Sequence, residues 1–306
     1  MAMTPHPYFL VAQNVIAIYR EADTSSEMTS QAIFGDVVQS LGARGRFTRV
    51  RTEDRYEGWA LTRWMTQFDA APDNLHTTIA PLFATVLCAP NHAGGIITRL
   101  TVSSRVVLGR ERVQNNYAPL LLPDGRLAYT HVGNLSSTFD PAPASGADAY
   151  SLVNGFERHA FAMEAFGGHL SATASLLIGT PYLWGGVTPF GIDCSGFTQL
   201  VYRVNGVQLL RDARLQIDDR RFGLVEFDTG LDTAPLAPGD LVFFGTSDPE
   251  RRVTHVGMAL GDTTFIHSAG SGRGVLVSQC SDPEFARTYI GARRLLSDAN
   301  LSIEAA

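Results

Sequence analysis

Residues 191–206 read GIDCSGFTQLVYRVNG, and this stretch decides how the second half of the chain is expected to fold. Its apolar residues recur at spacings of three and four, which predicts an amphipathic helix. They are Phe197, Leu200, Val201 and Val204. Asn205-Gly206 is a typical C-terminal stop for such a helix. Cys194 therefore stands at the predicted helix start, where free N–H groups and partial positive charge lower the pKa of a thiol.

The sequence that follows this helix predicts strands. After the APGD turn at 237–240 come four short apolar segments, DLVFFG, VTHVGMALG, TTFIHSAG and GVLVSQ. Such segments, separated by turns, are typical of an antiparallel run of strands. A helix that carries one key residue, followed by a sheet that carries its partners, is an α+β arrangement.

Two histidines lie in these predicted strands, His255 and His267. Their even separation of twelve residues (267 − 255) can return the chain to the same region of two neighbouring antiparallel strands. A cysteine with a base, and a third group that orients the base, is the general arrangement of an activated nucleophile. The alternative is that Cys194 is a buried, inert cysteine, which is the commoner fate of a lone one.

The first 145 residues predict all-β structure, with short apolar segments separated by turns in the manner of a small β-barrel. The first series of segments lies at 15–19, 32–42, 47–52 and 58–65. A second series resembles it and lies at 84–90, 97–109, 117–123 and 125–133. We interpret the two series as tandem copies of one barrel.

A Pro/Ala/Gly/Ser-rich stretch at 141–149 predicts a linker, and the spacing of apolar residues becomes helical from residue 150. A chain of 306 residues suggests two or three domains. We expect a first barrel at 1–68, a second barrel at 69–145 and an α+β domain at 146–306.

The composition limits the partners and the compartment. Lys plus Arg is 24 and Asp plus Glu is 30, a net charge of −6 without a long basic run, which argues against nucleic acid or an anionic membrane as the main partner. Three widely spaced cysteines suit a reducing compartment. The first twenty residues lack the charged start and long apolar stretch of a signal peptide, and no stretch predicts a membrane span. A cytoplasmic protein is therefore expected; a leader removed by cloning is the alternative.

The series PYLWGG, DCSGF, PGDLVFF, THVGMAL and FIHSAGSGRGV resembles, in order and context, the motif string of the NlpC-type bacterial cell-wall cysteine peptidases. The N-terminal barrels resemble bacterial Src-homology-type domains, which often accompany this catalytic domain. The combination is most similar to the γ-D-glutamyl-L-diamino acid endopeptidases. The resemblance implies a circularly rearranged papain-like fold, in which the cysteine precedes both histidines.

The resemblance also implies the catalytic roles. Cys194 would be the nucleophile, His255 the general base and acid, and His267 the group that orients His255. Tyr182, in PYLWGG, matches a family tyrosine near the oxyanion, and its hydroxyl would join the backbone N–H of Cys194 there. The alternative for Tyr182 and Trp184 is that both are ordinary core aromatics.

Other residues are expected to bind substrate. In the resembling enzymes, the aspartate at position 193 meets the free α-amine of an N-terminal L-alanine, although Asp193 is also well suited to cap the helix. Ser195 and Trp184 are also expected to bind substrate. A glutamate and a tyrosine from the first barrel would be Glu27 and Tyr56, with a solvated surface residue as the alternative for Glu27.

A further segment, LLRDARLQ, also matches the family and adds Arg211 and Asp212 to the expected substrate-binding residues; it contains Gln216 as well. This chain has Ala213 where some relatives have serine, which puts a side-chain contact to substrate at that position in doubt.

The expected function is hydrolysis of the γ-D-Glu–diamino acid bond of murein peptides with a free N-terminal L-Ala, in cell-wall recycling. No cofactor is expected, although Cys194, His255 and His267 would also suit a zinc site. Two other functions stay open: a wall-peptide-binding scaffold with an inactive peptidase domain, and a papain-fold amidase or acyltransferase. The diamino acid and the oligomeric state are left undecided.

Overall fold

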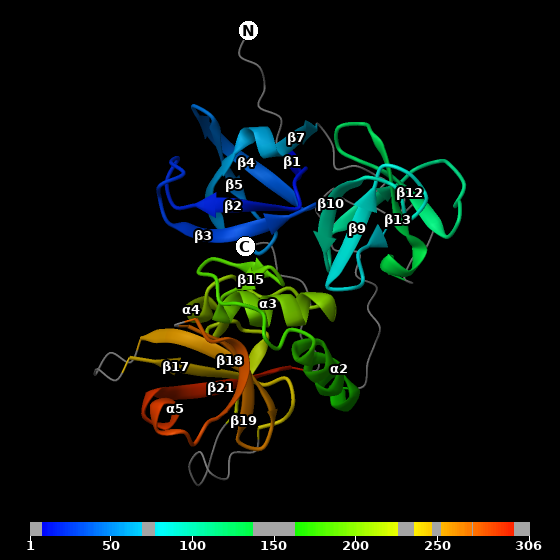
Figure 1. Cartoon of the computed structure of the whole chain (residues 1–306). Coiled ribbons are helices and arrows are strands. Elements are labelled where there is room, and N and C mark those ends of the chain that lie inside the picture. Colours follow the sequence, from blue (N-terminus) through cyan, green and yellow to red (C-terminus); the bar gives the residue numbers. More distant parts are fainter. Residues whose placement is uncertain are drawn as a thin grey trace. The chain divides into compact units, whose positions relative to one another are not determined.

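The computed structural model describes residues 8–68, 77–136, 163–225, 236–246, 252–270 and 272–296. The chain divides into two compact units, Met1–Glu157 and Arg158–Ala306 (Figure 1). The predicted linker, the helix predicted from residue 150 and both predicted domain boundaries lie outside the described residues, so they stay predictions.

The first sheet of the first unit contains seven strands, in the order β3-β2-β6-β5-β4-β1-β7. They are β1 (Tyr8–Val11), β2 (Val15–Tyr19), β3 (Met28–Ile33), β4 (Val37–Arg44), β5 (Phe47–Arg51), β6 (Glu57–Leu61) and β7 (Met65–Phe68). A 3-10 turn, η1 (Thr62–Trp64), joins β6 to β7. The sheet encloses its own apolar cluster, which includes Val11, Ile16, Ile18 and Val50.

The second sheet of this unit has six strands, in the order β10-β9-β13-β12-β11-β8. They are β8 (Thr77–Thr78), β9 (Phe83–Leu87), β10 (Ile96–Thr101), β11 (Arg105–Leu108), β12 (Tyr117–Leu121) and β13 (Leu127–His131), with a 3-10 turn η2 (Val132–Asn134) after β13. The described part of the N-terminal half is thus all-β, as predicted.

The segment 32–42, which the sequence presents as one apolar run, is not one strand. It is divided between β3 and β4 by a turn at Gly35, whose φ of +81° favours glycine. The Asp36 carboxylate closes this turn by accepting a hydrogen bond from the Ile33 N–H at 2.9 Å.

The second unit is built around a six-stranded antiparallel sheet, in the order β16-β21-β17-β18-β19-β20. Its strands are β16 (Phe222–Val225), β17 (Leu241–Gly245), β18 (Val253–Gly261), β19 (Thr264–Ala269), β20 (Gly274–Gln279) and β21 (Tyr289–Leu295). The strand run predicted after residue 240 is confirmed as β17 to β20. The sequence analysis did not identify β21, which lies between β16 and β17.

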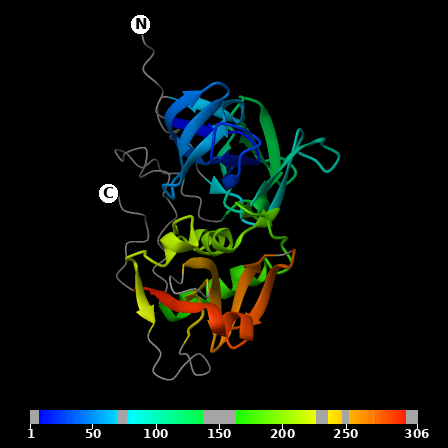
Figure 2. The ribbon, with the colours of Figure 1, turned by 90° about the vertical axis from the view of Figure 1, so that its left-hand side faces the viewer.

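Four helices and one short hairpin complete the described part of this unit. They are α2 (Met163–Ser175), β14 (Val187–Thr188) with β15 (Gly191–Ile192), α3 (Cys194–Val204), α4 (Ala213–Gln216) and α5 (Pro283–Thr288). Helix α3 packs against β18 and β19 (Figure 2). The predicted α+β class is therefore confirmed for this unit.

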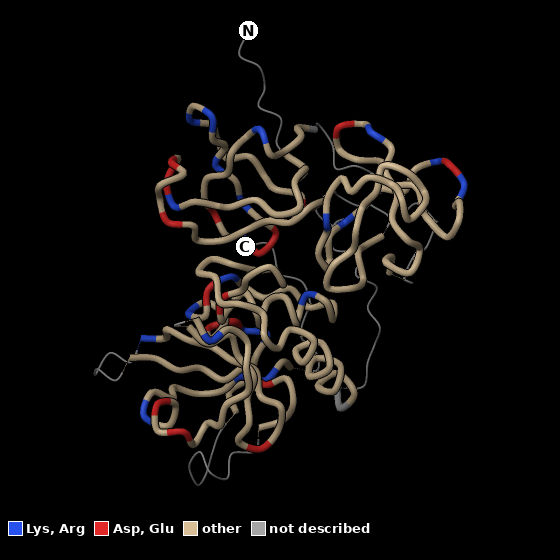
Figure 3. The backbone as a smooth tube through the Cα atoms, viewed as in Figure 1, with Lys and Arg blue, Asp and Glu red and all other residues tan. Residues whose placement is uncertain are grey.

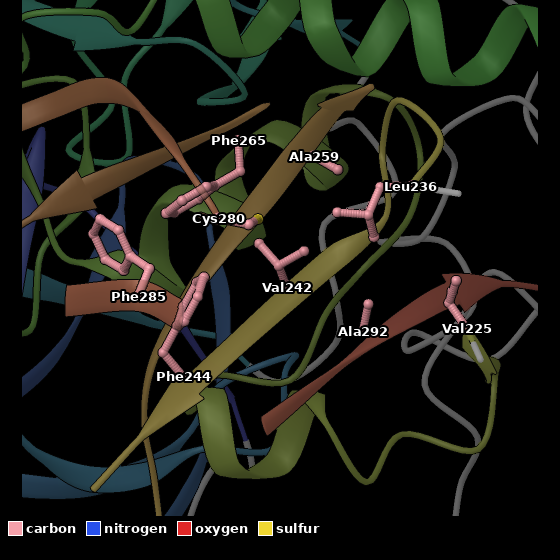
Figure 4. Close-up of a cluster of buried hydrophobic side chains, with 9 residues drawn as sticks. All are labelled: Val225, Leu236, Val242, Phe244, Ala259, Phe265, Cys280, Phe285 and Ala292. Carbon is pink, nitrogen blue, oxygen red and sulfur yellow. The ribbon is translucent and has the colours of Figure 1, made fainter. Parts of the chain in front are cut away.

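An apolar cluster supports the sheet of the second unit. Figure 4 shows it, with Val242 and Phe244 of β17 beside Phe265 of β19 and Phe285 of α5. Val242 and Phe244 are two residues apart, so they share one face of their strand. The strands near residues 255 and 267 therefore rest on a packed aromatic layer.

Charged residues of both signs are interspersed in each unit (Figure 3). In the part of the chain that the structure describes, none of the helices has the length and apolar character needed to cross a membrane.

Candidate active site

Cys194 is the first residue of α3, which confirms its predicted position at a helix start. The carboxylate of Asp193 caps the helix by accepting a hydrogen bond from the Gly196 N–H at 2.7 Å. The Cys194 side chain is buried, with 9% of the residue exposed. The thiol also receives a hydrogen bond from the backbone N–H of Val256, the residue after His255.

The expected lowering of the Cys194 pKa is wrong in direction. Burial, followed by the negative charge of Asp193, raises the pKa of Cys194 to about 12. The N–H groups of Val256 and Ser195 and the guanidinium of Arg211 act in the opposite direction, but they do not outweigh burial. The thiol is therefore neutral at neutral pH.

His255 of β18 and His267 of β19 lie on neighbouring antiparallel strands, as predicted. The Nε2 atom of His255 lies 2.7 Å from Nδ1 of His267. Gly257 makes this approach feasible: a Cβ on Gly257 would come within 3.1 Å of the His267 Cβ and 2.5 Å of the Phe265 ring. A side chain at 257 would share the face of β18 that carries His255.

Ser278 of β20 extends this pair and was not found from the sequence. Its Oγ lies 3.1 Å from Nε2 of His267, the nitrogen that does not face His255. Ser278 pairs with Phe265 across the β19–β20 hairpin, two residues from His267. The available signal was a hydroxyl inside the apolar segment GVLVSQ, at a register that only the hairpin geometry reveals.

Aromatic rings enclose both imidazoles. The Phe285 ring stacks on His255 at a centroid distance of 6.4 Å and meets His267 edge-on at 5.2 Å. Burial, and next the positive charge of Arg273, lower the pKa of His255 to about 4, although Asp193 acts in the opposite direction. Burial, with the charges of His255 and Arg273, lowers the pKa of His267 to about 3. Both rings are thus neutral at neutral pH, and His255 can accept a proton.

Tyr182 is placed next to Cys194 by backbone pairing. The Ile192 N–H donates to the Pro181 carbonyl at 3.0 Å, and the Leu183 N–H donates to the Ile192 carbonyl at 3.2 Å. Burial, and next the charge of Cys194, raise the pKa of Tyr182 to about 12, so the phenol keeps its proton. Trp184 is 60% exposed, so the core-aromatic alternative is wrong for this residue.

Asp193, Ser195 and Arg211 form one buried ion-pair cluster. The Arg211 guanidinium donates to both carboxylate oxygens of Asp193, at 2.6 and 3.1 Å, and to the Ser195 Oγ at 2.8 Å. The Gly185 N–H adds a further bond to Asp193 at 2.9 Å. Arg211 is only 1% exposed, and substrate binding by this residue stays a prediction. The capping role of Asp193 is confirmed, and binding of a substrate amine by Asp193 stays a prediction.

The rest of the LLRDARLQ segment also makes internal contacts. Gln216 is buried and bonds Thr198, the Ser195 carbonyl and the Leu210 carbonyl. Asp212 precedes α4 without a side-chain capping bond and pairs with exposed Arg214 at 3.2 Å. Substrate binding by Asp212 stays a prediction.

Glu27 and Tyr56 belong to the first unit. Glu27 pairs with Arg20 at 2.7 Å across a largely exposed surface. Each residue directly precedes a strand, β3 and β6 respectively, and both strands run antiparallel to β2, which lies between them. The two residues therefore lie at the same end of the first sheet.

Among the described residues, no group of three or more His, Cys, Asp or Glu side chains has an arrangement that could hold a metal ion.

Comparison with known proteins matches both units. Residues 179–294 match the NlpC/P60 family, and residues 18–63 match the bacterial dipeptidyl-peptidase Sh3 domain. These ranges contain every expected site residue discussed above.

Similar proteins extend the match to most of the chain. A Bacillus cereus protein named gamma-D-glutamyl-L-lysine dipeptidyl-peptidase is 26% identical over 89% of this chain and 76% of its own. A crystal structure of an NlpC/P60 family protein from Bacillus cereus superimposes with a TM-score of 0.73 at 21% identity, covering 94% of this chain and 99% of that one.

The probable endopeptidase NlpC of Escherichia coli is 36% identical over 38% of this chain and 70% of its own length. The chain therefore belongs to the NlpC/P60 family, with an N-terminal all-β Src-homology-like region.

Proposed function

We propose that the protein is a cysteine peptidase that hydrolyses the γ-D-Glu–diamino acid bond of short cell-wall peptides. The observation that carries the proposal is the hydrogen bond between His255 and His267, next to the thiol of Cys194 at its helix start. The name of the Bacillus cereus relative, a gamma-D-glutamyl-L-lysine dipeptidyl-peptidase, supports the proposal that this bond is the one hydrolysed.

The first chemical step is acylation of the thiol. Nε2 of His255 faces His267, which leaves Nδ1 as the nitrogen that accepts the thiol proton. As the proton moves, Sγ of Cys194 attacks the scissile carbonyl carbon and forms a tetrahedral intermediate. The backbone N–H of Cys194 and the protonated phenol of Tyr182 donate to the oxyanion.

Collapse of this intermediate breaks the C–N bond, and His255 returns its proton to the leaving amine of the diamino acid. A water molecule then attacks the thioester, with His255 again taking a proton, and the free thiol is restored. Because the resting thiol and imidazole are both neutral, each step moves one proton through His255.

The order of the site residues along the chain, with Cys194 before both histidines, supports a circularly rearranged papain-like domain. The two sheets of the first unit support the interpretation as two tandem barrels at 1–68 and 69–145. Cleavage of short peptides with a free N-terminus suits the recycling of released wall fragments, which we place in the cytoplasm.

We assign recognition of the free α-amine to Glu27 and Tyr56 of the first unit. The matched Sh3 domain range, 18–63, contains both first-unit residues, and they lie at one end of their sheet. An ammonium beside a carboxylate gains charge-assisted hydrogen bonds that an acylated amine cannot form.

The test compares kcat/KM for L-Ala-γ-D-Glu-L-Lys and its N-acetyl form. The wild type should prefer the free amine by at least ~30-fold, which corresponds to about 2 kcal/mol. Glu27→Gln should lose most of this preference, while Glu21→Gln, an exposed carboxylate of the same loop, should keep it. Equal cleavage of both peptides by the wild type would refute amine recognition and favour a general wall hydrolase.

A further inference from the structure

Two arginines of the second unit, Arg211 and Arg273, have no role in the catalytic chemistry or in amine recognition. Arg211 is fully buried and held by Asp193 and Ser195, so its positive charge is matched inside the protein. Arg273 differs in both respects. Its side chain is 50% exposed, and its ion pair with Glu284 has a separation of 3.5 Å.

Backbone contacts place Arg273 between the other site elements. It directly precedes β20, whose second residue, Val275, donates its N–H to the Thr180 carbonyl at 2.9 Å. The Gly179 N–H returns a bond to the Val275 carbonyl, also at 2.9 Å. These bonds join the β19–β20 hairpin to the segment that continues into Tyr182.

On its other side, Arg273 faces helix α5. Its partner Glu284 is the neighbour of Phe285, the ring that packs on both His255 and His267. The positive charge of Arg273 acts on both imidazoles and lowers the pKa of each. The guanidinium thus pairs with the helix whose Phe285 packs on both histidines, and it is also open to solvent.

The bond that Arg273 makes is readily exchanged. Glu284 is 56% exposed, and an exposed ion pair contributes little to stability. Arg offers several N–H donors in a planar fork that matches a carboxylate, so a substrate carboxylate can replace Glu284 without leaving a buried charge.

We propose that Arg273 binds a free carboxylate of the peptide substrate. The inference rests on the proposed function. A glutamate linked through its γ-carbonyl keeps its α-carboxylate free, near the scissile bond. The third residue of a tripeptide carries the other free carboxylate. Both offer the same chemistry, and selective amidation separates them.

The experiment measures kcat/KM of the wild type and of Arg273→Gln on three peptides. The first is L-Ala-γ-D-Glu-L-Lys, the second carries an α-carboxamide on the glutamate, and the third carries a C-terminal amide on the lysine. Arg273→Gln should lose ~10- to 100-fold on the first peptide, as expected for loss of a charge-assisted bond. On the peptide that lacks the bound carboxylate, the wild type and the variant should agree within ~3-fold.

A loss of the same size on all three peptides would overturn the proposal, because Arg273 would then act through the histidines or the fold. The substrate comparison removes any effect on the His255 pKa, since that effect is common to all peptides. Arg287→Gln, an exposed arginine of the same helix as Glu284, is the matched control and should leave all rates unchanged.

Glu284→Gln keeps the guanidinium and removes its competitor, so activity on the first peptide should be retained or increased. A fall comparable to that of Arg273→Gln would count against the proposal. Absence of cleavage by the wild type on all three peptides would refute the proposed function itself, and this outcome is distinct from an Arg273 effect that ignores amidation.

Discussion

In the proposed mechanism, the two ring nitrogens of His255 have different roles: Nδ1 accepts the thiol proton and Nε2 faces His267. In order to accept the thiol proton at Nδ1, the neutral ring has to carry its own proton at Nε2, where it donates to Nδ1 of His267. His267 then carries its proton at Nε2 and donates to the Ser278 hydroxyl. In the proposed mechanism each contact fixes the tautomer of the ring before it, and Ser278 would thereby orient His255 through His267.

Ser278 is therefore expected to be a positioning residue for catalysis. Ser278→Val should lower kcat roughly 3- to 10-fold with KM unchanged, since one neutral hydrogen bond contributes about 0.5 to 1.5 kcal/mol. Threonine has nearly the same shape as valine but carries a hydroxyl, so Ser278→Thr should have a kcat close to that of the wild type. Steady-state kinetics of the two variants decide the matter, and a valine variant as active as the threonine variant would contradict this role.

Helix α3 depends on a charged cluster at its first turn. Asp193 caps the helix and accepts hydrogen bonds from Arg211, which also binds Ser195 on the other side of Cys194. Gln216 adds a bond from the following segment to the Ser195 carbonyl at 3.2 Å. The backbone around Cys194 is thus fixed by buried polar contacts, and each removal leaves a buried partner without its bond.

Replacement of Asp193 should consequently destabilise the second unit. Asp193→Ala leaves the Arg211 guanidinium buried without its carboxylate, and we expect a loss of about 3 to 5 kcal/mol in the free energy of unfolding. Asp212→Ala is the matched control, because Asp212 also precedes a helix but makes no capping bond. Its expected cost is below ~1 kcal/mol. Urea unfolding measures both, and a similar small cost for both variants would show that the cluster is not important for stability.

Local patterns were sufficient to predict the strands near the site but not their order. VTHVGMALG and GVLVSQ correspond to β18 and β20 because their apolar residues, turns and length agree. The position of β21 between β16 and β17 is set by pairing of segments far apart in sequence, such as Val242 with Ala292. No local pattern contains that information.

The candidate site shows the same limit. The pairing of His255 with His267 follows from an even spacing on adjacent strands. The raised pKa of Cys194 does not, because it results from burial by distant parts of the chain. Likewise, the motif contains Arg211 but does not show that its guanidinium is buried against the Asp193 carboxylate.

At the scale of the whole molecule, the two sheets of the first unit are joined by buried contacts. Phe34, from the turn between β3 and β4, packs in the apolar cluster of the second sheet, and its carbonyl accepts from the Arg105 N–H at 3.1 Å. The Arg105 guanidinium donates to both carboxylate oxygens of Glu53, at 2.6 and 2.7 Å. Asp36 lies 3.6 Å from the same guanidinium. The two sheets therefore share part of their core.

The contacts of Arg105 with Glu53 and Asp36 should contribute strongly to the stability of the first unit. Arg105→Met leaves Glu53 and Asp36 without their buried cation, and it should cost about 3 kcal/mol or more in urea unfolding. Arg99→Met changes an exposed arginine of β10, the strand that precedes β11 in the chain, and should leave the free energy of unfolding almost unchanged. If the Arg105 variant were as stable as the Arg99 variant, the two sheets would not depend on each other through this contact.

The central claim is that the Cys194 thiol, with His255 as its base, cleaves the γ-D-Glu–diamino acid bond. The most direct measurement is mass spectrometry of L-Ala-γ-D-Glu-L-Lys after incubation with the wild type, Cys194→Ala and the exposed-cysteine control Cys88→Ala. The wild type and the Cys88 variant should release L-Ala-D-Glu and lysine, with or without a chelator, and Cys194→Ala should release neither. Undiminished release of L-Ala-D-Glu by Cys194→Ala would contradict the cysteine-peptidase mechanism.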